Sequence, residues 1–189
     1  MTQANEILIL TGTPGAGKTT TAKALAAMPG PPKVHLHSDD FWHFIKQGAI
    51  PPFLESAHRQ NDIVVNVLAQ AADGYAKGGY FVVVDGVIGP WFLHAFRRLS
   101  SRIHYVVLQI DVESAVARCQ ARGGDTLTDP KVIASLHNQF SLLDKLSNHE
   151  LDIRGYSPEC TLGAVVAAIG SGAYLLRDEM GGAHAIPAG

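Results

Sequence analysis

Short apolar runs alternate with longer mixed segments along most of the chain. Runs rich in Val and Ile predict β-strands. They cover residues 7–10, 34–36, 80–84 and 103–110, with a fifth, less apolar run at 150–154. Two of the runs lack the polar alternation of a half-exposed strand, which is typical of strands buried on both faces. This pattern favours a parallel sheet covered by helices.

The segments between these runs predict helices, from an apolar period near 3.6 residues, from Ala-rich composition or from flanking breakers. They cover residues 19–28, 41–47, 55–77, 111–122, 129–146 and 160–169. Asp111 and Asp129 suit helix N-termini, and Ser157 suits a cap before Pro158 at a first helical position. Because strands alternate with helices, the sequence predicts an α/β fold with a parallel sheet and right-handed crossovers.

Length and composition predict a single globular domain over residues 1–189. A chain of 189 residues that is 47% hydrophobic can bury a sizeable core, which excludes global disorder. Residues 1–5 and the Gly-rich residues 180–189 are expected to be mobile tails.

Charge and cysteine usage exclude several function classes. Fifteen Lys and Arg against 17 Asp and Glu leave a net charge of −2, so we expect no nucleic-acid or membrane partner. Cys119 and Cys160 are too few for a disulfide scaffold. The first residues lack the basic stretch of a signal peptide, and residues 7–10 are too short to span a membrane. We therefore expect a cytoplasmic protein.

A glycine-rich segment follows the first predicted strand and matches the phosphate-binding pattern G-x-x-x-x-G-K-[ST] at every specified position. Its residues are Gly12, Thr13, Pro14, Gly15, Ala16, Gly17, Lys18 and Thr19. Such glycines let backbone N–H groups surround a phosphate, the Lys reaches the β- and γ-phosphates, and the Thr hydroxyl binds Mg²⁺. Thr20 is included among the expected nucleotide-binding residues. The alternative is a glycine-rich turn that only packs strand against helix.

With this loop, residues 6–170 resemble the small P-loop kinases that have the nucleoside-monophosphate-kinase fold. The nearest branch holds gluconate kinases, chloramphenicol phosphotransferase and zeta-toxin-like sugar-nucleotide kinases. The resemblance implies a three-layer α/β sandwich with a five-stranded parallel sheet. It also implies an acceptor-side helical region at 38–79, a short helical lid at 118–130, and ATP with Mg²⁺ as cofactors. A fold-level likeness leaves the acceptor to be argued from the site.

The second predicted strand leads into Asp39. Residues just past the carboxyl end of a strand in a parallel sheet face the ligand. The resemblance places a carboxylate near the acceptor hydroxyl here, so Asp39 is the expected catalytic base. Asp39 or Asp40 could instead cap a helix. A second alternative is a zinc site, because His35, His37 and Asp39 alternate along the strand like part of the H-x-H-x-D-H signature of metallo-β-lactamase-type hydrolases. Asp40 stands where that signature ends in His.

The third predicted strand leads into Asp85, which is followed by Gly86. By the resemblance, Asp85 takes the Walker B position and holds Mg²⁺ through water. It could also hydrogen-bond the acceptor, or only form an Asp-Gly turn.

Arg118 and Arg122 are four residues apart and share a helix face. Related kinases carry such a pair at the start of the lid. The resemblance therefore implies that Arg122 clamps the transferred phosphate, that Arg118 contacts the nucleotide and that residues 123–124 act as a hinge. Two solvated arginines on an exposed helix are the alternative. Residues 154–158 fall where relatives cradle adenine.

Between residues 38 and 79, the Lys and Arg residues are Lys46, Arg59 and Lys77. The same segment is rich in aromatic residues and proline, namely Phe41, Trp42, Phe44, Pro51, Pro52 and Phe53. A phosphate-bearing acceptor usually needs a focused cationic fork. We therefore expect an uncharged small molecule with a free hydroxyl, sugar-like or antibiotic-like. The aromatic residues could instead fill the core, and Arg59 or Arg97 could supply a charge.

Together these residues predict an ATP-dependent phosphotransferase, acting as a monomer or homodimer. Lys18 and Arg122 would stabilise the transferred group, Thr19 and Asp85 would hold the metal, and Asp39 would align the acceptor. The alternative is an NTP-hydrolysing regulatory ATPase or switch. Against it, the chain has no Asn-Lys-x-Asp guanine motif, and Gly86 stands where a paired acid would be.

Overall fold

The computed structural model describes residues 4–123 and 127–176, and within them five strands form one sheet. The strands are β1 (Glu6–Gly12), β2 (Lys33–His37), β3 (Phe81–Asp85), β4 (Arg102–Gln109) and β5 (Glu150–Asp152). Their order is β2-β3-β1-β4-β5, and all neighbours are parallel. The predicted α/β fold with a five-stranded parallel sheet is confirmed.

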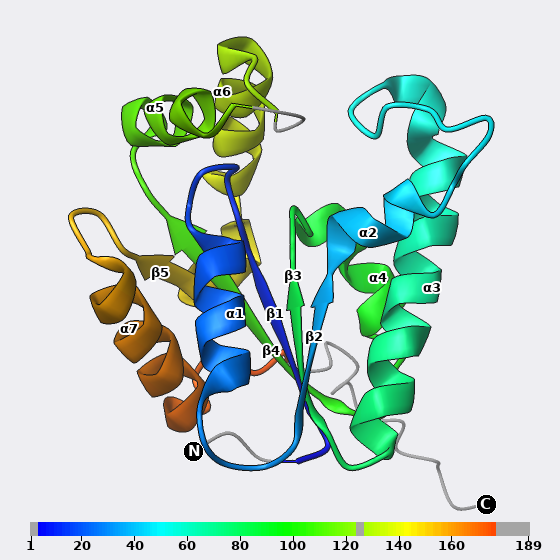
Figure 1. Ribbon diagram of the computed structural model, residues 1–189, viewed down its shortest axis with the longest axis vertical. Coiled ribbons are helices and arrows are strands. Elements are labelled where there is room, and N and C mark those ends of the chain that lie inside the picture. The colour runs from blue at the N-terminus through cyan, green and yellow to red at the C-terminus, as the bar shows by residue number, and fades with distance from the viewer. Residues whose placement is uncertain (1–3, 124–126, 177–189) are drawn as a thin grey trace, which may run out of the picture.

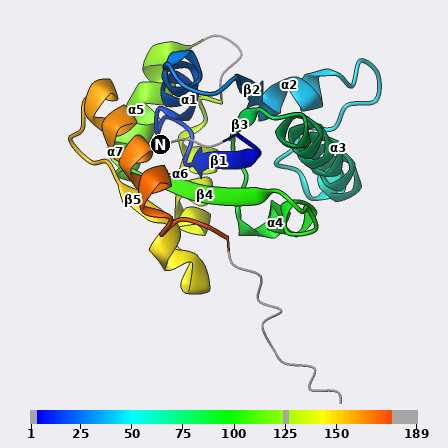
Figure 2. The same cartoon turned by 90° about the horizontal axis from the view of Figure 1, so that it is seen from below.

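Helices cover both faces of this sheet (Figures 1 and 2). One face packs against α1 (Lys18–Ala27), α5 (Val112–Arg122) and α7 (Pro158–Ser171), and the other against α3 (His58–Lys77) and α4 (Leu93–Phe96). Neighbouring residues of β1 point to opposite faces of the sheet. Leu8 and Leu10 pack on the face that α1, α5 and α7 cover, and Ile7 and Ile9 pack on the face that α3 and α4 cover. The three-layer sandwich follows from this alternation.

Three helices begin where the sequence predicts caps. Asp111 accepts a hydrogen bond from the Ser114 backbone N–H at 2.7 Å, at the start of α5. Asp129 likewise caps α6 (Pro130–Phe140), and Ser157 caps α7. No helix in the described ranges is both long and apolar enough to cross a membrane.

The predicted helix at 129–146 is wrong in its extent. It ends with α6 at Phe140, and a separate 3₁₀ helix, η3 (Asp144–His149), follows. The Phe140 carbonyl accepts a hydrogen bond from Gln109 Nε2 of β4 at 2.9 Å, and the Ser141 hydroxyl donates to the His137 carbonyl at 3.0 Å. Side-chain donors thus bind carbonyls of the last turn, in place of the backbone N–H groups that a further helical turn would supply.

The predicted helix at 41–47 is also displaced. The observed helix α2 (Ser38–His43) begins directly after β2. Ser38 is buried against Gly86, where any Cβ would overlap its hydroxyl. Residues 87–99, for which the sequence analysis proposed no element, hold the 3₁₀ helix η2 (Pro90–Phe92) and α4.

Two side-chain amides at the start of α3 hold the long loop between α2 and η1 (Glu55–Ala57). Gln60 accepts a hydrogen bond from the Ile50 N–H at 2.8 Å and donates to the Ile50 carbonyl at 2.6 Å. Asn61, which is buried, donates to the Pro52 carbonyl at 2.7 Å and accepts from Trp42 Nε1 at 2.8 Å. The loop and α2 are therefore tied to the same turn of α3.

A buried acid lies at the amino-terminal ends of β1 and β4. Glu6 is 2.8 Å from Arg102 Nη1 and 3.1 Å from His104 Nε2. Burial lowers the pKa of His104 below its usual value, although the contact with Glu6 works in the opposite direction. Nearby, the Asn5 N–H donates to the Tyr80 carbonyl at 3.1 Å. Of the tails expected to be mobile, residues 1–3 and 180–189 lie outside the described residues.

We expect Asn61→Ala to lower the free energy of unfolding by about 1–3 kcal/mol, because the Trp42 and Pro52 groups then lose their buried partner. Urea denaturation measures the loss, and hydrogen exchange should show earlier opening of residues 50–57. Asn66→Ala is the matched control, since among the described residues the Asn66 amide donates to the Asp62 carbonyl of its own helix and not to the loop. An equal loss in both variants would contradict the proposed anchoring.

The contribution of His104 to the free energy of unfolding should fall as the pH drops from 7.5 to 5.5. The pKa of His104 lies lower in the folded state, so the unfolded chain takes up the proton first and acid favours it. His104→Gln, which retains a donor toward Glu6, should make this decline shallower. Urea denaturation at several pH values measures the slope, with the exposed His43→Gln as control. Equal slopes in the parent protein and His104→Gln would disprove the effect.

Candidate active site

The predicted phosphate loop joins β1 to α1 at the carboxyl edge of the sheet (Figure 1). Its glycines have positive φ angles of 134° at Gly12, 84° at Gly15 and 84° at Gly17. A Cβ at Gly12 would overlap the Leu108 carbonyl oxygen, and one at Gly15 would crowd the Ala115 carbonyl oxygen. Glycine alone combines these angles with such close approach. The loop thus has the tight backbone that a phosphate cradle requires.

Lys18, the first residue of α1, is buried beside this loop. Its Nζ donates to the carbonyls of Gly12 at 3.0 Å and Thr13 at 2.9 Å, which uses two of the three donors of the ammonium. Burial lowers the pKa of Lys18 to about 8, against the attraction of Asp85 and Asp39. The cation is therefore held at the loop and in the field of both predicted site carboxylates.

Thr19 and Asp85 meet as the predicted metal site requires. The Thr19 hydroxyl donates to Asp85 Oδ2 at 2.6 Å, and Asp85 is fully buried at the end of β3. A hydroxyl beside a carboxylate offers the oxygen ligands that Mg²⁺ prefers. Within the described residues, the buried Thr13 hydroxyl of the loop has no hydrogen-bond partner, so it offers one more polar group to a ligand. These residues fit both Mg²⁺ and a nucleotide phosphate.

Two histidines of β2 converge on Asp85. His35 Nε2 lies 2.5 Å from Oδ1, and His37 Nδ1 lies 3.2 Å from each carboxylate oxygen. Burial acts to raise the pKa of Asp85, but the hydrogen bonds with His35, His37 and Thr19 outweigh it and hold the pKa well below its usual range. The hydrogen bond with Asp85 raises the pKa of His37. Asp85 is thus a buried anion supported by three side chains.

The zinc alternative at His35, His37 and Asp39 finds no support in this geometry. Both imidazoles are engaged by Asp85, and His37 Nε2 lies 3.6 Å from Asp39 Oδ2. Across residues 4–123 and 127–176, no group of three or more His, Cys, Asp or Glu side chains could hold a metal ion. The histidines instead position the Asp85 carboxylate.

Asp39 lies in the first turn of α2, next to the end of β2, and its side chain is 60% exposed. The Ser38 hydroxyl donates to Asp39 Oδ1 at 3.3 Å. The N-cap of α2 is His37, and no side chain caps this helix, so neither Asp39 nor Asp40 serves as its cap. The Asp39 carboxylate therefore stays accessible to a ligand at the carboxyl edge of the sheet.

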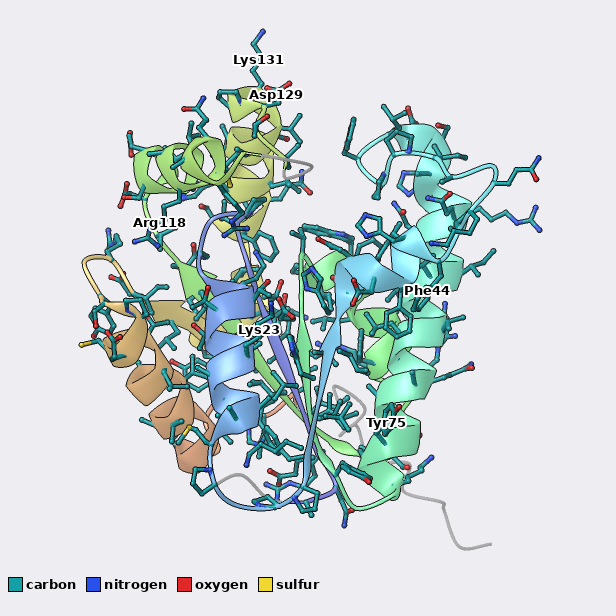
Figure 3. All side chains as sticks on the ribbon, in the orientation of Figure 1. Lys23, Phe44, Tyr75, Arg118, Asp129 and Lys131 are labelled. Atoms are coloured by element: carbon teal, nitrogen blue, oxygen red, sulfur yellow. The ribbon has the colours of Figure 1, made fainter. Side chains whose placement is uncertain are left out.

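The paired arginines of α5 lie beside the phosphate loop. Arg118 Nη1 donates to the Gly15 carbonyl at 3.4 Å (Figure 3). Arg122, one turn later, is close enough for its charge to lower the pKa of Lys18 further. Gly123 follows α5 with φ of 60°, while Gly124 of the expected hinge lies outside the described residues. The lid role of residues 118–130 stays a prediction.

The predicted adenine loop begins on the surface, where Arg154 Nη2 lies 2.5 Å from Asp152 Oδ2. It borders a hollow of about 380 Å³ at the carboxyl ends of β4 and β5. Asp111 and His137 line the opposite side of this hollow. The role of residues 154–158 in binding adenine stays a prediction.

Sequence reasoning missed two features of this site. The first is the support of Asp85 by His35 and His37. The sequence places His37 and Asp85 just past the ends of two predicted strands, but only the pairing of these strands sets the two residues opposite each other. The second is an aromatic segment after β3, where Trp91 and Phe92 pack between α2 and α6. No periodic pattern marks that segment.

The profile of a family described as an AAA domain matches residues 8–131, more than half of the chain. Comparison with curated protein sequences finds no match.

Among solved structures, the tunicamycin resistance protein of Deinococcus radiodurans has a TM-score of 0.66 at 16% identity, over 87% of this chain and 95% of that one. Thymidylate kinase from Candida albicans has a TM-score of 0.64 at 15% identity, over 94% and 97% of the two chains. A gluconokinase from Sinorhizobium meliloti 1021 has a TM-score of 0.62 at 15% identity, over 90% and 95%. Identities this low show the fold alone.

The loop geometry and these matches agree with one another. The chain belongs to the AAA domain family, and its fold is that of the P-loop kinases of the nucleoside-monophosphate-kinase type.

Proposed function

We propose that this protein is an ATP-dependent kinase that phosphorylates a hydroxyl of a small, uncharged molecule. The observation that supports it best is the placement of Asp39. The Asp39 carboxylate is accessible, and the residue before it, Ser38, packs on Gly86. Gly86 in turn directly follows Asp85, the buried residue of the proposed metal site. The gluconokinase with a similar fold supports the coarser part of the proposal, phosphoryl transfer to a small molecule.

The phosphate loop and α1 bind the ATP phosphates in this proposal. The backbone of residues 12–17 surrounds the β-phosphate, the Lys18 ammonium lies against the β- and γ-phosphates, and the positive end of α1 faces them. Thr19 and Asp85 hold Mg²⁺, which when bound offsets the negative charge of the phosphate oxygens. Arg118 and Arg122 approach from α5 and stabilise charge on the transferred group.

Asp39 then acts on the acceptor. Its carboxylate orients the acceptor hydroxyl and accepts the hydroxyl proton while the acceptor oxygen bonds to the γ-phosphorus. The bond from that phosphorus to the β–γ bridging oxygen breaks, and ADP leaves with the electron pair. His37 lies 3.6 Å from Asp39, and its raised pKa favours an imidazolium that stabilises the carboxylate before transfer.

The side chains around Asp39 favour an uncharged acceptor. Phe41 and Trp42 are half-buried and pack against the core, as the core-filling alternative expects, but Phe44 is 67% exposed (Figure 3) and Phe53 is 62% exposed. The acceptor side thus presents apolar surface. Lys46 and Arg59 are exposed on this segment, and no described hydrogen bond or ion pair joins them into a fork.

Asp39→Asn should lower acceptor-dependent ADP release by about 10²–10⁴-fold, because the amide cannot accept the hydroxyl proton. ATP affinity should change far less, since Asp39 acts on the phosphate loop only through its charge on Lys18, and no hydrogen bond or ion pair of the described residues joins the two. A coupled ADP assay with a panel of sugars, nucleosides and antibiotic-like alcohols measures the first effect, and nucleotide titration the second. Asp40→Asn, on the next position of α2, is the matched control.

The same assay separates the kinase from a hydrolysing switch. Rapid ATP hydrolysis without any acceptor, equal in the parent protein and Asp39→Asn, would favour the switch and sink the kinase proposal.

Asp85→Asn should raise the Mg²⁺ concentration for half-maximal activity by about 10–100-fold, because one anionic ligand that orients the metal is lost. Steady-state titration of Mg²⁺ at saturating ATP and acceptor measures this shift. If Asp85 instead binds the acceptor, the acceptor KM rises while the Mg²⁺ requirement stays constant, which would refute the metal assignment. Circular dichroism of the variant shows whether the fold persists.

A further inference from the structure

Trp91 is one of several exposed large apolar residues, and its place near the candidate site sets it apart. It lies in η2, which follows Asp85 after a short loop, and its side chain is 40% exposed. Large aromatic side chains gain most when they are buried, so an indole left open beside a site is a candidate ligand surface.

The indole is fixed in place by its neighbours. It lies over Gly89, where a Cβ would overlap three atoms of its six-membered ring. Its ring centroid is 5.7 Å from that of Phe140 on α6 and 6.0 Å from that of Phe92. Gly89 has φ of −75° and ψ of 175°, angles that any residue adopts, so its backbone does not require glycine. The absence of a side chain at this position leaves room for the indole.

The same segment reaches the acceptor side of the site. Phe92 contacts Trp42 of α2 with ring centroids 6.4 Å apart, and Asp39 lies three residues before Trp42. Residues 90–92 thus span from α6, through Trp91, to the helix that carries the proposed base. In Figure 1, α6 and α2 lie on opposite sides of the carboxyl edge of the sheet.

His94, three residues after Trp91, is held by two acceptors. His94 Nδ1 lies 3.0 Å from the Trp91 carbonyl, and His94 Nε2 lies 2.8 Å from Asp62 Oδ1. The indole face itself carries no formal charge, so it binds the face of an aromatic or sugar ring better than it binds a phosphate.

We propose that Trp91 is a specificity-determining residue of the kinase, on which the acceptor stacks a ring face while its hydroxyl points to Asp39. This inference rests on the proposed function for the identity of the ligand. The acceptor class is an uncharged ring compound with a free hydroxyl, either a nucleoside-like or aryl alcohol or a sugar.

Steady-state kinetics test this role with an acceptor found in the ADP assay. Trp91→Ala should raise the acceptor KM by about 10–100-fold and leave kcat within about threefold, as expected for loss of stacking alone. Trp91→Phe should restore most of the affinity. Gly89→Ala should raise the KM similarly, because it displaces an indole that is still present.

Tyr75→Ala is the matched control, since Tyr75 is similarly exposed at 46% but lies on α3 away from the site (Figure 3). Its KM should equal that of the parent protein. An unchanged KM in both Trp91→Ala and Gly89→Ala, or a loss confined to ATP affinity, overturns the inference and leaves the phosphotransferase function intact.

Binding can be followed without phosphoryl transfer through tryptophan fluorescence in the full chain. Thymidine, chloramphenicol and glucose are the neutral probes, and thymidine monophosphate and gluconate the anionic ones. At least one neutral probe should quench the emission in the parent protein and in Asp39→Asn, but not in Trp91→Ala. If no acceptor yields ADP, the proposed function fails, while quenching lost in Trp91→Ala still supports Trp91 as a ligand surface. No quenching by any neutral probe overturns it.

Discussion

The buried carboxylate of Asp85 is the constraint on which the site depends. An ion with no exposure to water is costly unless hydrogen bonds replace its hydration, and here Thr19, His35 and His37 supply them. These partners come from α1 and β2, while Asp85 itself ends β3. One anion therefore joins the helix that follows the phosphate loop to the strand that leads to Asp39, and the Lys18 cation lies in its field.

The regular elements near the site could be predicted because their signals are local. Strands buried on both faces appear as continuous apolar runs, and the helix starts at Asp111 and Ser157 are marked by capping residues beside the first turn. Tertiary contacts decide the elements that were wrong. Helix α6 stops where Gln109 of β4 binds its last carbonyl, and α2 begins where Ser38 packs on Gly86. No local pattern contains either contact.

The same distinction applies to the site. The phosphate loop is contiguous in sequence, so its residues could be named together, and Thr19 could be paired with Asp85 through the resemblance. The support from His35 and His37 depends on the register that sets His37 opposite Asp85, which two separate strands determine only on pairing. Trp91 has no local marker for a related reason, since its position depends on Gly89 and on Phe140 of another helix.

The way α3 holds the loop before it has an evolutionary consequence. Gln60 binds both the N–H and the carbonyl of Ile50, and Asn61 binds the carbonyl of Pro52. These anchors grip the main chain, so they do not depend on which side chains the loop displays. Exposed residues such as Phe53 are therefore free to diverge between descendants of this chain without loosening the loop. In the proposed kinase, substitution there would change acceptor preference and leave the phosphate loop as it is.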